Sequence, residues 1–220
     1  MKIFIVIPAY NEEDRIKAVI ENIKKTKCDF PIVVIDDGSK DNTGKVAKKL
    51  GLIVLEHKIN LGKGAALRTG CDYAFKNGAD AVILMDSDGQ HKADDLVKFI
   101  GALNKGSEVV FGSRNYNNDV PLVRYLGNKF ASVMVASFFR IYISDILCGF
   151  KAFTKKAYKK LRWGSSGYSV ETEIAVLTGK NKLSFCQVPI ATVYYDAVKG
   201  VTILDAVGTF FDLIYWRIKK

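Results

Sequence analysis

Five apolar segments of strand length alternate with segments of helical period over the first half of this chain of 220 residues. Short runs rich in Val and Ile, bounded by Gly, Pro, Asn or Asp, are typical of buried strands. The predicted strands cover residues 3–7, 31–35, 52–56, 81–85 and 108–112, and the helices between them cover about 12–25, 42–50, 65–77 and 94–103. Such alternation predicts an α/β fold with a mostly parallel sheet and helices on both faces.

The pattern changes after residue 112, where longer helical segments replace the regular alternation. The predicted elements are a polar loop at 115–119, an apolar helical segment at 121–143, a turn at 145–150, a helix at 170–177, a strand at 184–189 and an amphipathic helix at 201–220. No repeat, low-complexity stretch or linker interrupts the sequence. We therefore expect a single domain over residues 1–200, followed by a C-terminal amphipathic helix.

Composition limits the class of protein. Hydrophobic residues make up 49% of the chain, which is enough for one substantial core. The sequence contains no stretch of 18 apolar residues without a charge, so it predicts no membrane span. The net charge of +10 favours an anionic partner such as nucleic acid, anionic lipid or a phosphorylated small molecule. Four widely spaced cysteines without a CxxC pair argue against a zinc site or a disulfide framework and fit reduced thiols in a cytosol.

The strand predicted at 81–85 runs directly into two carboxylates. Asp86 and Asp88 are followed by Gln90, so that two carboxylates and an amide leave the sheet together. Hard oxygen ligands of this kind suit Mg²⁺ or Mn²⁺ combined with phosphate oxygens. A polar turn after a strand is the alternative reading of the same residues, because Asp, Ser and Gly favour turns.

Two other predicted strands also end in polar segments, at residues 8–12 and 36–39. Because the carboxyl ends of parallel strands lie at one edge of a sheet, the three segments are expected to form one crevice. A carboxylate such as Asp37 can accept a hydrogen bond from a base or a ribose hydroxyl. The first strand lacks a GxGxxG fingerprint, and Gly62-Lys63-Gly64-Ala65 lacks P-loop spacing, so that this loop is interpreted mainly as a glycine turn that starts a helix.

Eight segments in this order resemble the inverting glycosyltransferases of family 2, which have a GT-A (Rossmann-like) fold. The resemblance is strongest to the polyprenyl-phosphate hexosyltransferases related to dolichyl-phosphate mannose synthase. The matching segments are Ile7–Glu12, Val34–Ser39, Asn60–Gly64, Met85–His91, Gly112–Arg114, Arg124–Asn128, Asp145–Lys151 and Val188–Ile190. They extend over nearly the whole chain, so the ordered set is far more specific than any one segment.

The resemblance implies a role for each matched side chain. It implies a nucleoside site formed by Pro8, Tyr10, Glu12, Ile35, Asp37, Asp86 and Ser87. It implies a site for Mg²⁺ or Mn²⁺ formed by Asp86, Asp88 and Gln90. It implies contacts to the donor and acceptor phosphates from Arg114, Arg124 and Lys151. Asp86, Asp88, Arg114 and Arg124 are thus the expected catalytic residues, whereas His91 is interpreted as a structural imidazole.

The implied reaction transfers a hexose from a UDP-sugar or GDP-mannose to a polyprenyl (dolichyl) phosphate. A phosphate monoester has a second pKa of about 6, so this acceptor needs cations more than a general base. Asp145 is either such a base or a carboxylate that binds the Cys148-Gly149 turn. Asp196 stands where mannose synthases are expected to have an arginine, which weakens the case for GDP-mannose. Residues 167–173 look more like relatives that use UDP-sugars.

A lipid acceptor requires contact with a membrane. The segments 121–143 and 201–220 mix aromatic and aliphatic residues with Arg or Lys, as interfacial helices do, although core helices or a dimer face explain the same pattern. We expect a peripheral protein at the inner, cytoplasmic face of the membrane, with homo-oligomerisation left open and no nucleic-acid partner. The alternatives are a glycosyltransferase with a soluble sugar or polysaccharide acceptor, a nucleotidyltransferase, and a basic nucleic-acid-binding module.

Overall fold

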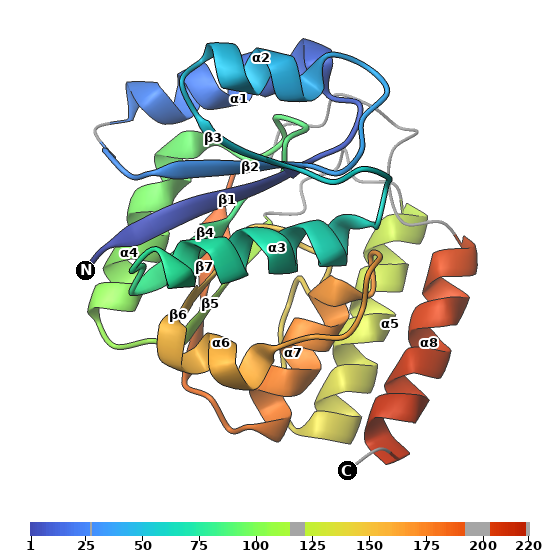
Figure 1. The fold of residues 1–220 in the computed structure, drawn as a ribbon. Coiled ribbons are helices and arrows are strands. Elements are labelled where there is room, and N and C mark those ends of the chain that lie inside the picture. Colours follow the sequence, from blue (N-terminus) through green and yellow to red (C-terminus); the bar gives the residue numbers. More distant parts are fainter. Residues whose placement is uncertain (27, 115–121, 192–202, 219–220) are drawn as a thin grey trace.

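The computed structural model describes residues 1–26, 28–114, 122–191 and 203–218, and leaves out the side chains of 122–124, 203–207, 209 and 210. One sheet of seven strands runs through the molecule (Figure 1). The strands are β1 (Ile3–Ala9), β2 (Ile32–Asp36), β3 (Ile53–Glu56), β4 (Ala81–Leu84), β5 (Val109–Arg114), β6 (Lys151–Thr154) and β7 (Phe185–Ile190). The helices are α1 (Glu13–Lys25), α2 (Thr43–Lys49), α3 (Lys63–Lys76), α4 (Leu96–Asn104, preceded by a 3₁₀ turn at Ala93–Asp95), α5 (Leu122–Phe139), α6 (Lys155–Leu161), α7 (Val170–Lys180) and α8 (Ile203–Ile218).

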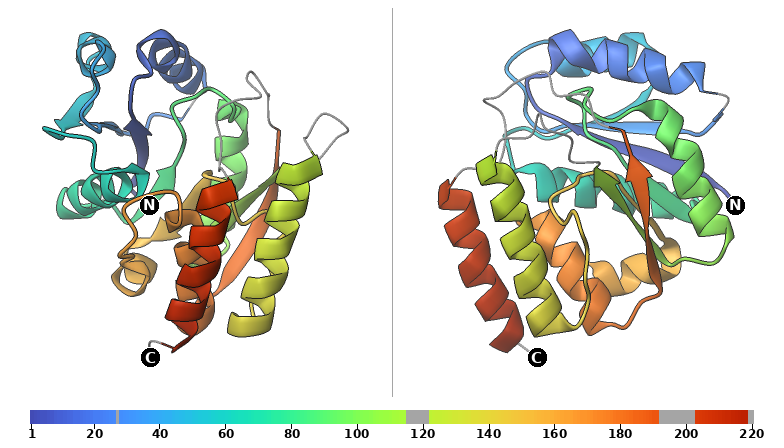
Figure 2. Two further views of the ribbon diagram at one scale, coloured as in Figure 1. Left: turned by 90° about the vertical axis from the view of Figure 1, so that its right-hand side faces the viewer. Right: turned by 180° about the vertical axis from the view of Figure 1, so that it is seen from behind.

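The strand order is β3-β2-β1-β4-β6-β5-β7, and only β6 is antiparallel to its neighbours. Helices cover both faces, as the alternation of strands and helices predicts. Residues of α1, α2 and α4 pack in one hydrophobic core, whereas residues of α3 and of α5 to α8 pack in the other. Figure 2 shows α5 and α8 side by side on the second of these faces. The predicted single α/β domain with a mostly parallel sheet is confirmed.

The pair β6 and α6 was not predicted from the sequence. β6 has only four residues and begins with a lysine, so it lacks the long apolar run that distinguishes the other central strands. It nevertheless lies between β4 and β5 in the middle of the sheet, where Phe153 and Ala152 are fully buried. The turn predicted at 145–150 is therefore the connection that carries the chain into a central strand.

The two predicted interfacial segments form helices, with bounds slightly shorter than expected. α5 ends at Phe139, and α8 spans residues 203–218. None of the helices in the described ranges combines the length and the apolar character that crossing a bilayer requires. Pro121, the predicted polar loop at 115–119 and Asp196 lie outside the described residues.

Candidate active site

The carboxyl ends of β1, β2, β4 and β5 lie at one edge of the sheet, because these strands run in the same direction. The segments after β1 and β2 are joined by several hydrogen bonds, three of which involve Asn11 and Glu12. The Asn11 N–H donates to Ser39 Oγ at 3.0 Å, the Glu12 N–H donates to Thr43 Oγ1 at 2.8 Å, and the Lys40 N–H donates to Asn11 Oδ1 at 2.8 Å. The two predicted nucleoside loops therefore form one rigid wall of the site.

Asp37 lies at the base of this wall and is almost fully buried. Its carboxylate accepts hydrogen bonds from the N–H groups of Leu61 at 3.0 Å and Gly62 at 2.8 Å, and it contacts His57 Nδ1 at 2.7 Å. The other ring nitrogen of His57 lies 3.0 Å from Thr69 Oγ1. Asp37 thus fixes the glycine-rich loop with most of its acceptor capacity, and direct contact with a nucleoside stays a prediction.

The other predicted nucleoside residues differ in accessibility. Tyr10 is 39% exposed beside the wall, and Glu12 forms an ion pair with Arg15 at 3.3 Å. Pro8, Ile35 and Ser87 are buried. The side chain of Ile35 packs beneath α3, so any contact of this residue with a nucleoside involves its backbone.

The pKa values of the two carboxylates after β4 are shifted in opposite directions. Burial raises the pKa of Asp86, but the Lys63 ammonium, at 2.7 Å, outweighs burial and brings this pKa to about 2. Burial and the negative charge of Asp86 raise the pKa of Asp88 to about 6. The Gln90 N–H donates to Asp88 Oδ1 at 3.0 Å, so this turn holds the second carboxylate in place.

Two neighbours fix the position of Asp86. A Cβ atom at Gly149 would overlap its carboxylate, so only glycine allows the turn before β6 to lie this close. His91 stacks on Phe150 with ring centroids 5.0 Å apart, and its Nδ1 accepts a long hydrogen bond of 3.4 Å from the Asp86 N–H. Burial lowers the pKa of His91 to about 4, which keeps the ring neutral and agrees with a structural role.

Asp86, Asp88 and Gln90 suit a divalent ion that also binds a ligand. Within the described residues, no three His, Cys, Asp or Glu side chains are grouped closely enough to hold a metal by themselves. Burial and the negative charge of Asp86 raise the pKa of Asp88, and a divalent cation would relieve the repulsion between the two carboxylates. Mg²⁺ usually takes one or two carboxylates and completes its shell with water and substrate phosphates, so this donor set fits an ion shared with a diphosphate.

The partly exposed Arg114 forms an ion pair with the buried Asp145 at the end of β5. The guanidinium donates to Asp145 from Nε at 2.6 Å and from Nη2 at 2.8 Å, and the Arg114 N–H donates to the same carboxylate at 3.0 Å. Asp145 is fully buried and positions Arg114 through these hydrogen bonds, so its role as a base or as a ligand of the Cys148-Gly149 turn stays a prediction. Arg124 is in the first turn of α5, and its side chain lies outside the described residues.

Lys151, the third predicted phosphate contact, is buried at the start of β6. Its ammonium donates to the carbonyl groups of Cys148 and Ile146 and lies 5.9 Å from the centre of the Phe111 ring. Burial lowers the pKa of Lys151, although the negative charge of Glu171 opposes this shift. The structure therefore places Lys151 beneath the site, and its contact with an acceptor phosphate stays a prediction.

Comparison with known proteins decides the family. Residues 4–162 match the model of Glycosyl transferase family 2. The chain belongs to that family. It is a glycosyltransferase, and the predicted resemblance is confirmed.

This family 2 enzyme is similar over its whole length to proteins that act on polyprenyl phosphates. It is 34% identical to the UDP-N-acetylglucosamine–dolichyl-phosphate N-acetylglucosaminyltransferase of Methanococcus voltae, across 99% of this chain and 97% of that protein. It is 27% identical to the polyprenol monophosphomannose synthase of Mycolicibacterium smegmatis, across 98% and 86%. A crystal structure of glucosyl-3-phosphoglycerate synthase from Mycobacterium tuberculosis matches with a TM-score of 0.74 and 21% identity, across 99% and 79%. The predicted GT-A fold is confirmed.

The sequence analysis of this glycosyltransferase missed a buried chain of charges. Lys63, at the start of α3, lies 2.7 Å from Asp86 Oδ1 and also 2.7 Å from Oε1 of Glu171, in the first turn of α7. The predicted glycine turn does start α3 here, and Lys63 additionally points at Asp86, a predicted metal ligand. The Gly-Lys-Gly sequence was a usable signal for Lys63, whereas nothing in the local sequence indicates that Glu171 meets it.

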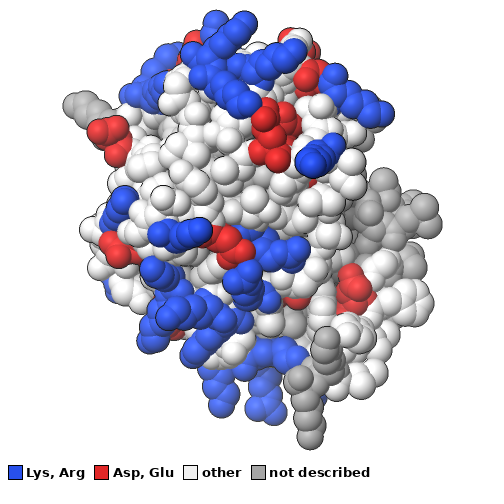
Figure 3. All heavy atoms as spheres, in the orientation of Figure 1, with Lys and Arg blue, Asp and Glu red and all other residues white. Residues whose placement is uncertain are grey.

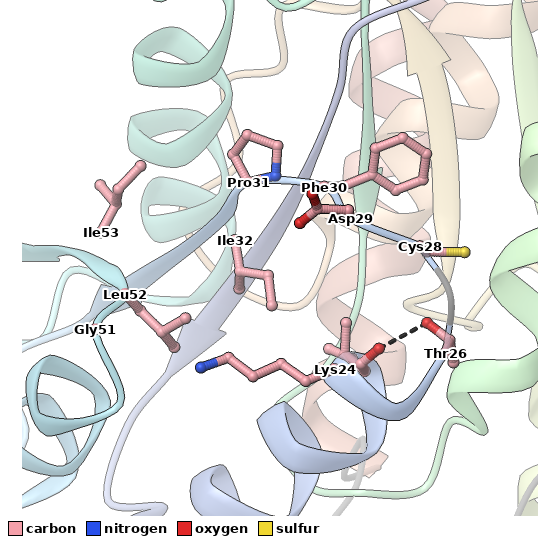
Figure 4. Close-up of a pocket in the computed structure, with 11 residues that line it drawn as sticks. Lys24, Thr26, Cys28, Asp29, Phe30, Pro31, Ile32, Gly51, Leu52 and Ile53 are labelled. Atoms are coloured by element: carbon pink, nitrogen blue, oxygen red, sulfur yellow. Dashed lines mark hydrogen bonds between the residues drawn. The ribbon is translucent and has the colours of Figure 1, made fainter.

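A cavity of about 400 Å³ lies elsewhere on this enzyme. Figure 4 shows its lining, which includes Lys24, Cys28, Pro31 and Leu52. Pro31 and Leu52 directly precede β2 and β3, so the cavity is at the amino ends of these strands, opposite the edge that carries Asp86. The Lys24 ammonium donates to the Leu50 carbonyl at 2.8 Å. This cavity does not contribute to the candidate active site.

Proposed function

We propose that this glycosyltransferase moves a hexose from a nucleotide diphosphate sugar to a polyprenyl (dolichyl) phosphate at a membrane surface, with inversion and with Mg²⁺ or Mn²⁺. The observation that carries the proposal is the carboxylate pair of Asp86 and Asp88, in which the pKa of one group is lowered to about 2 and that of the other is raised to about 6. Such a pair is suited to a divalent ion on a diphosphate. The full-length similarity to a dolichyl-phosphate N-acetylglucosaminyltransferase supports the acceptor.

A UDP-sugar is the donor that we expect. The Methanococcus voltae relative is named for UDP-N-acetylglucosamine, and the Mycobacterium tuberculosis synthase was crystallised with Mn²⁺ and UDP. In this chain the nucleoside would lie against the wall formed by the loops after β1 and β2, near Tyr10. Asp86, Asp88 and Gln90 would hold the cation, which neutralises charge on the departing diphosphate when it is bound.

The transfer itself is a direct displacement. An oxygen of the acceptor phosphate forms a bond to the anomeric carbon as the bond from that carbon to the donor diphosphate breaks, and the nucleoside diphosphate leaves with the electron pair. No proton has to be removed, because a phosphate monoester is mostly dianionic at pH 7 with a second pKa of about 6. This agrees with Asp145 being engaged by Arg114. Arg114 is the described cation best placed to orient the acceptor.

Access to a lipid is supported by an exposed apolar stripe on α5. Leu126, Phe130 and Val133 follow one another at helical spacing on this helix and are more than half exposed. On α8, which packs beside α5, Phe211, Tyr215 and Ile218 are also exposed.

Positive charge gathers on other parts of the surface, over α1 and α2 at the top of Figure 3 and over α6 lower down. Figure 3 shows Lys and Arg side chains gathered over α6, where the exposed lysines are Lys155, Lys156, Lys159 and Lys160. Basic residues near an anionic membrane each add about 1 kcal/mol of attraction. The apolar stripe and this charge together support a peripheral position on an anionic membrane.

A donor panel tests the function. The enzyme is incubated with dolichyl phosphate in detergent and with UDP-N-acetylglucosamine, UDP-glucose or GDP-mannose, with Mn²⁺ or with EDTA, and lipid-linked sugar is measured by mass spectrometry. We expect a lipid-linked product from one UDP-sugar in the presence of Mn²⁺ and its loss in EDTA. The Asp88→Asn variant should lose most of this activity.

The same assay has outcomes that contradict the proposal. Equal product formation in EDTA would show that the reaction does not require a metal. Transfer to a soluble oligosaccharide and not to dolichyl phosphate would replace the acceptor, and would then call for a carboxylate base. Absence of a lipid-linked product with every donor would overturn the function as stated.

A further inference from the structure

Glu171 contains a polar atom that no described group of the protein satisfies. The residue is 4% exposed, and its Oε1 is paired with Lys63 at 2.7 Å. Its Oε2 is buried and has no hydrogen-bond partner in the described structure. A buried carboxylate oxygen without a donor is costly, and native proteins nearly always supply one from the protein, water or a ligand.

The position of this oxygen relates it to the donor. One ammonium group, that of Lys63, separates Glu171 from Asp86, which is a predicted ligand of the diphosphate-bound cation. The hexose is attached to that diphosphate, so the sugar must lie within a few bonds of Asp86. The side chains of Asp86 and Lys63 are 22% and 19% exposed, so the charge chain opens toward the site at this end, whereas Glu171 is its inner end.

The surroundings of Glu171 are held in place by its own helix. Glu173, two residues further along α7, accepts hydrogen bonds from the N–H groups of Gly164 at 2.9 Å and Ser165 at 2.8 Å. The Ser166 carbonyl in turn accepts a hydrogen bond from the Ala65 N–H at 3.1 Å, which ties this loop to the start of α3. Glu173 thus accepts hydrogen bonds with both of its oxygens, whereas among the described residues Glu171 has no donor for Oε2.

We propose that Glu171 is a specificity-determining residue for the donor sugar, with Oε2 accepting a hydrogen bond from a hydroxyl or an N-acetyl N–H of a neutral hexose. The inference rests on the proposed function and adds to it the side chain that recognises the sugar part of the donor. Lys63 links this recognition to Asp86, so that the sugar and the diphosphate are positioned together. A donor that lacks the recognised group leaves Oε2 unpaired in the bound state and binds more weakly.

The test compares a nucleotide with its sugar conjugate. Binding of UDP and of UDP-N-acetylglucosamine, and of GDP and GDP-mannose, is measured by calorimetry with Mn²⁺ for the wild-type enzyme and for Glu171→Gln. For the pair that the wild-type enzyme binds, we expect Glu171→Gln to weaken the sugar nucleotide about 10- to 100-fold more than the bare nucleotide, the usual effect of losing a hydrogen bond to a charged group. Any change in the Lys63 pair affects both ligands and cancels in this ratio.

A matched control separates sugar recognition from loss of a buried carboxylate. Glu173→Gln removes such a carboxylate from the same helix, and we expect it to lower the melting temperature while leaving the ratio of the two affinities within about twofold of wild type. If Glu171→Gln does not fold, Glu171→Asp keeps the charge and withdraws it by one methylene, and it should shift the ratio in the same direction. Circular dichroism and melting curves report folding for each variant.

The outcomes distinguish the two proposals. Equal losses for nucleotide and sugar nucleotide, or no loss for either, overturn the role of Glu171 while leaving the proposed function intact. A wild-type enzyme that binds no nucleotide sugar overturns the function and this inference with it. Deoxy-sugar donors extend the result, because the deoxy position at which Glu171→Gln causes no additional loss identifies the hydroxyl that Oε2 accepts.

Discussion

The protonation of Asp88 changes in the physiological pH range, because burial and the charge of Asp86 raise its pKa to about 6. A cation binds the carboxylate form, so protons and metal compete for this group. Above pH 6 the carboxylate is free to bind, and below pH 6 it is increasingly protonated. We therefore expect Mn²⁺ to bind about tenfold more weakly at pH 5 than at pH 7, measured by electron paramagnetic resonance of the free ion.

The Asp88→Asn variant is the control for this titration. It lacks the titrating proton, so its Mn²⁺ affinity should be weak and nearly constant over the same range. A wild-type affinity that is equally flat from pH 5 to pH 7 would show that Asp88 does not bind the ion through a group with this pKa.

Asp145 offers a second prediction at the scale of one residue, because two interpretations of it differ in their consequences. As the buried partner of Arg114, it holds a guanidinium through two side-chain hydrogen bonds of 2.6 and 2.8 Å. Removing one member of a buried ion pair costs about 3–5 kcal/mol, so Asp145→Asn should lower the free energy of unfolding by about that amount in urea titrations. The pH dependence of the remaining activity should keep its shape.

A general base would behave differently. If Asp145 removed a proton from the acceptor, Asp145→Asn would abolish the acidic limb of the pH–activity profile, in addition to the loss of stability from the broken ion pair. Asp95→Asn serves as the comparison for stability, since Asp95 is also buried and paired with a cation, Lys98, at 2.6 Å, but on the opposite face of the sheet.

At the scale of elements, the turn that leads into β6 shapes the metal site. Gly149 lies so close to Asp86 that a methyl group there must displace the carboxylate. We expect Gly149→Ala to weaken Mn²⁺ binding about 10- to 100-fold, as changes next to metal ligands do. Gly101→Ala in α4 is the matched control, because a methyl group at that position would meet no atom within 4 Å, and it should stabilise the helix by about 0.5–1 kcal/mol. Unchanged Mn²⁺ affinity in Gly149→Ala would contradict the crowding.

The elements also show which parts of the molecule could be predicted from sequence. Asp86 and Asp88 were found because they directly follow a buried strand, and the chain itself places them at the edge of the sheet. The pairs Lys63–Glu171 and Arg114–Asp145 join residues from different elements, and their meeting depends on packing that no local pattern encodes. The position of β6 between β4 and β5 could not be predicted from the local sequence either, since strand order follows from the tertiary fold.

Burial changes how charged residues in the matched segments are interpreted. Asp37 and Lys151 both carry charges that suggest ligand contacts, yet each forms hydrogen bonds mainly with the backbone around it. A charged residue in a motif can therefore support the site from beneath. The sequence does not separate that role from direct binding, because both roles require the same charge and side-chain length.

For the whole molecule, we propose that the exposed stripe on α5 is the side that meets a membrane. Leu126 and Phe130 are 54% and 56% exposed, so charging them removes apolar contact with lipid at little expected loss of stability. Burying one such side chain contributes about 1.5–3 kcal/mol, so the double variant Leu126→Glu/Phe130→Glu should bind anionic vesicles at least about 100-fold more weakly in sedimentation assays. The control is Val97→Glu, an equally exposed apolar position on α4, which covers the other face of the sheet. The double variant should retain activity on a short, water-soluble polyprenyl phosphate, which separates membrane contact from chemistry. Equal vesicle binding by the two variants would move the membrane contact away from α5.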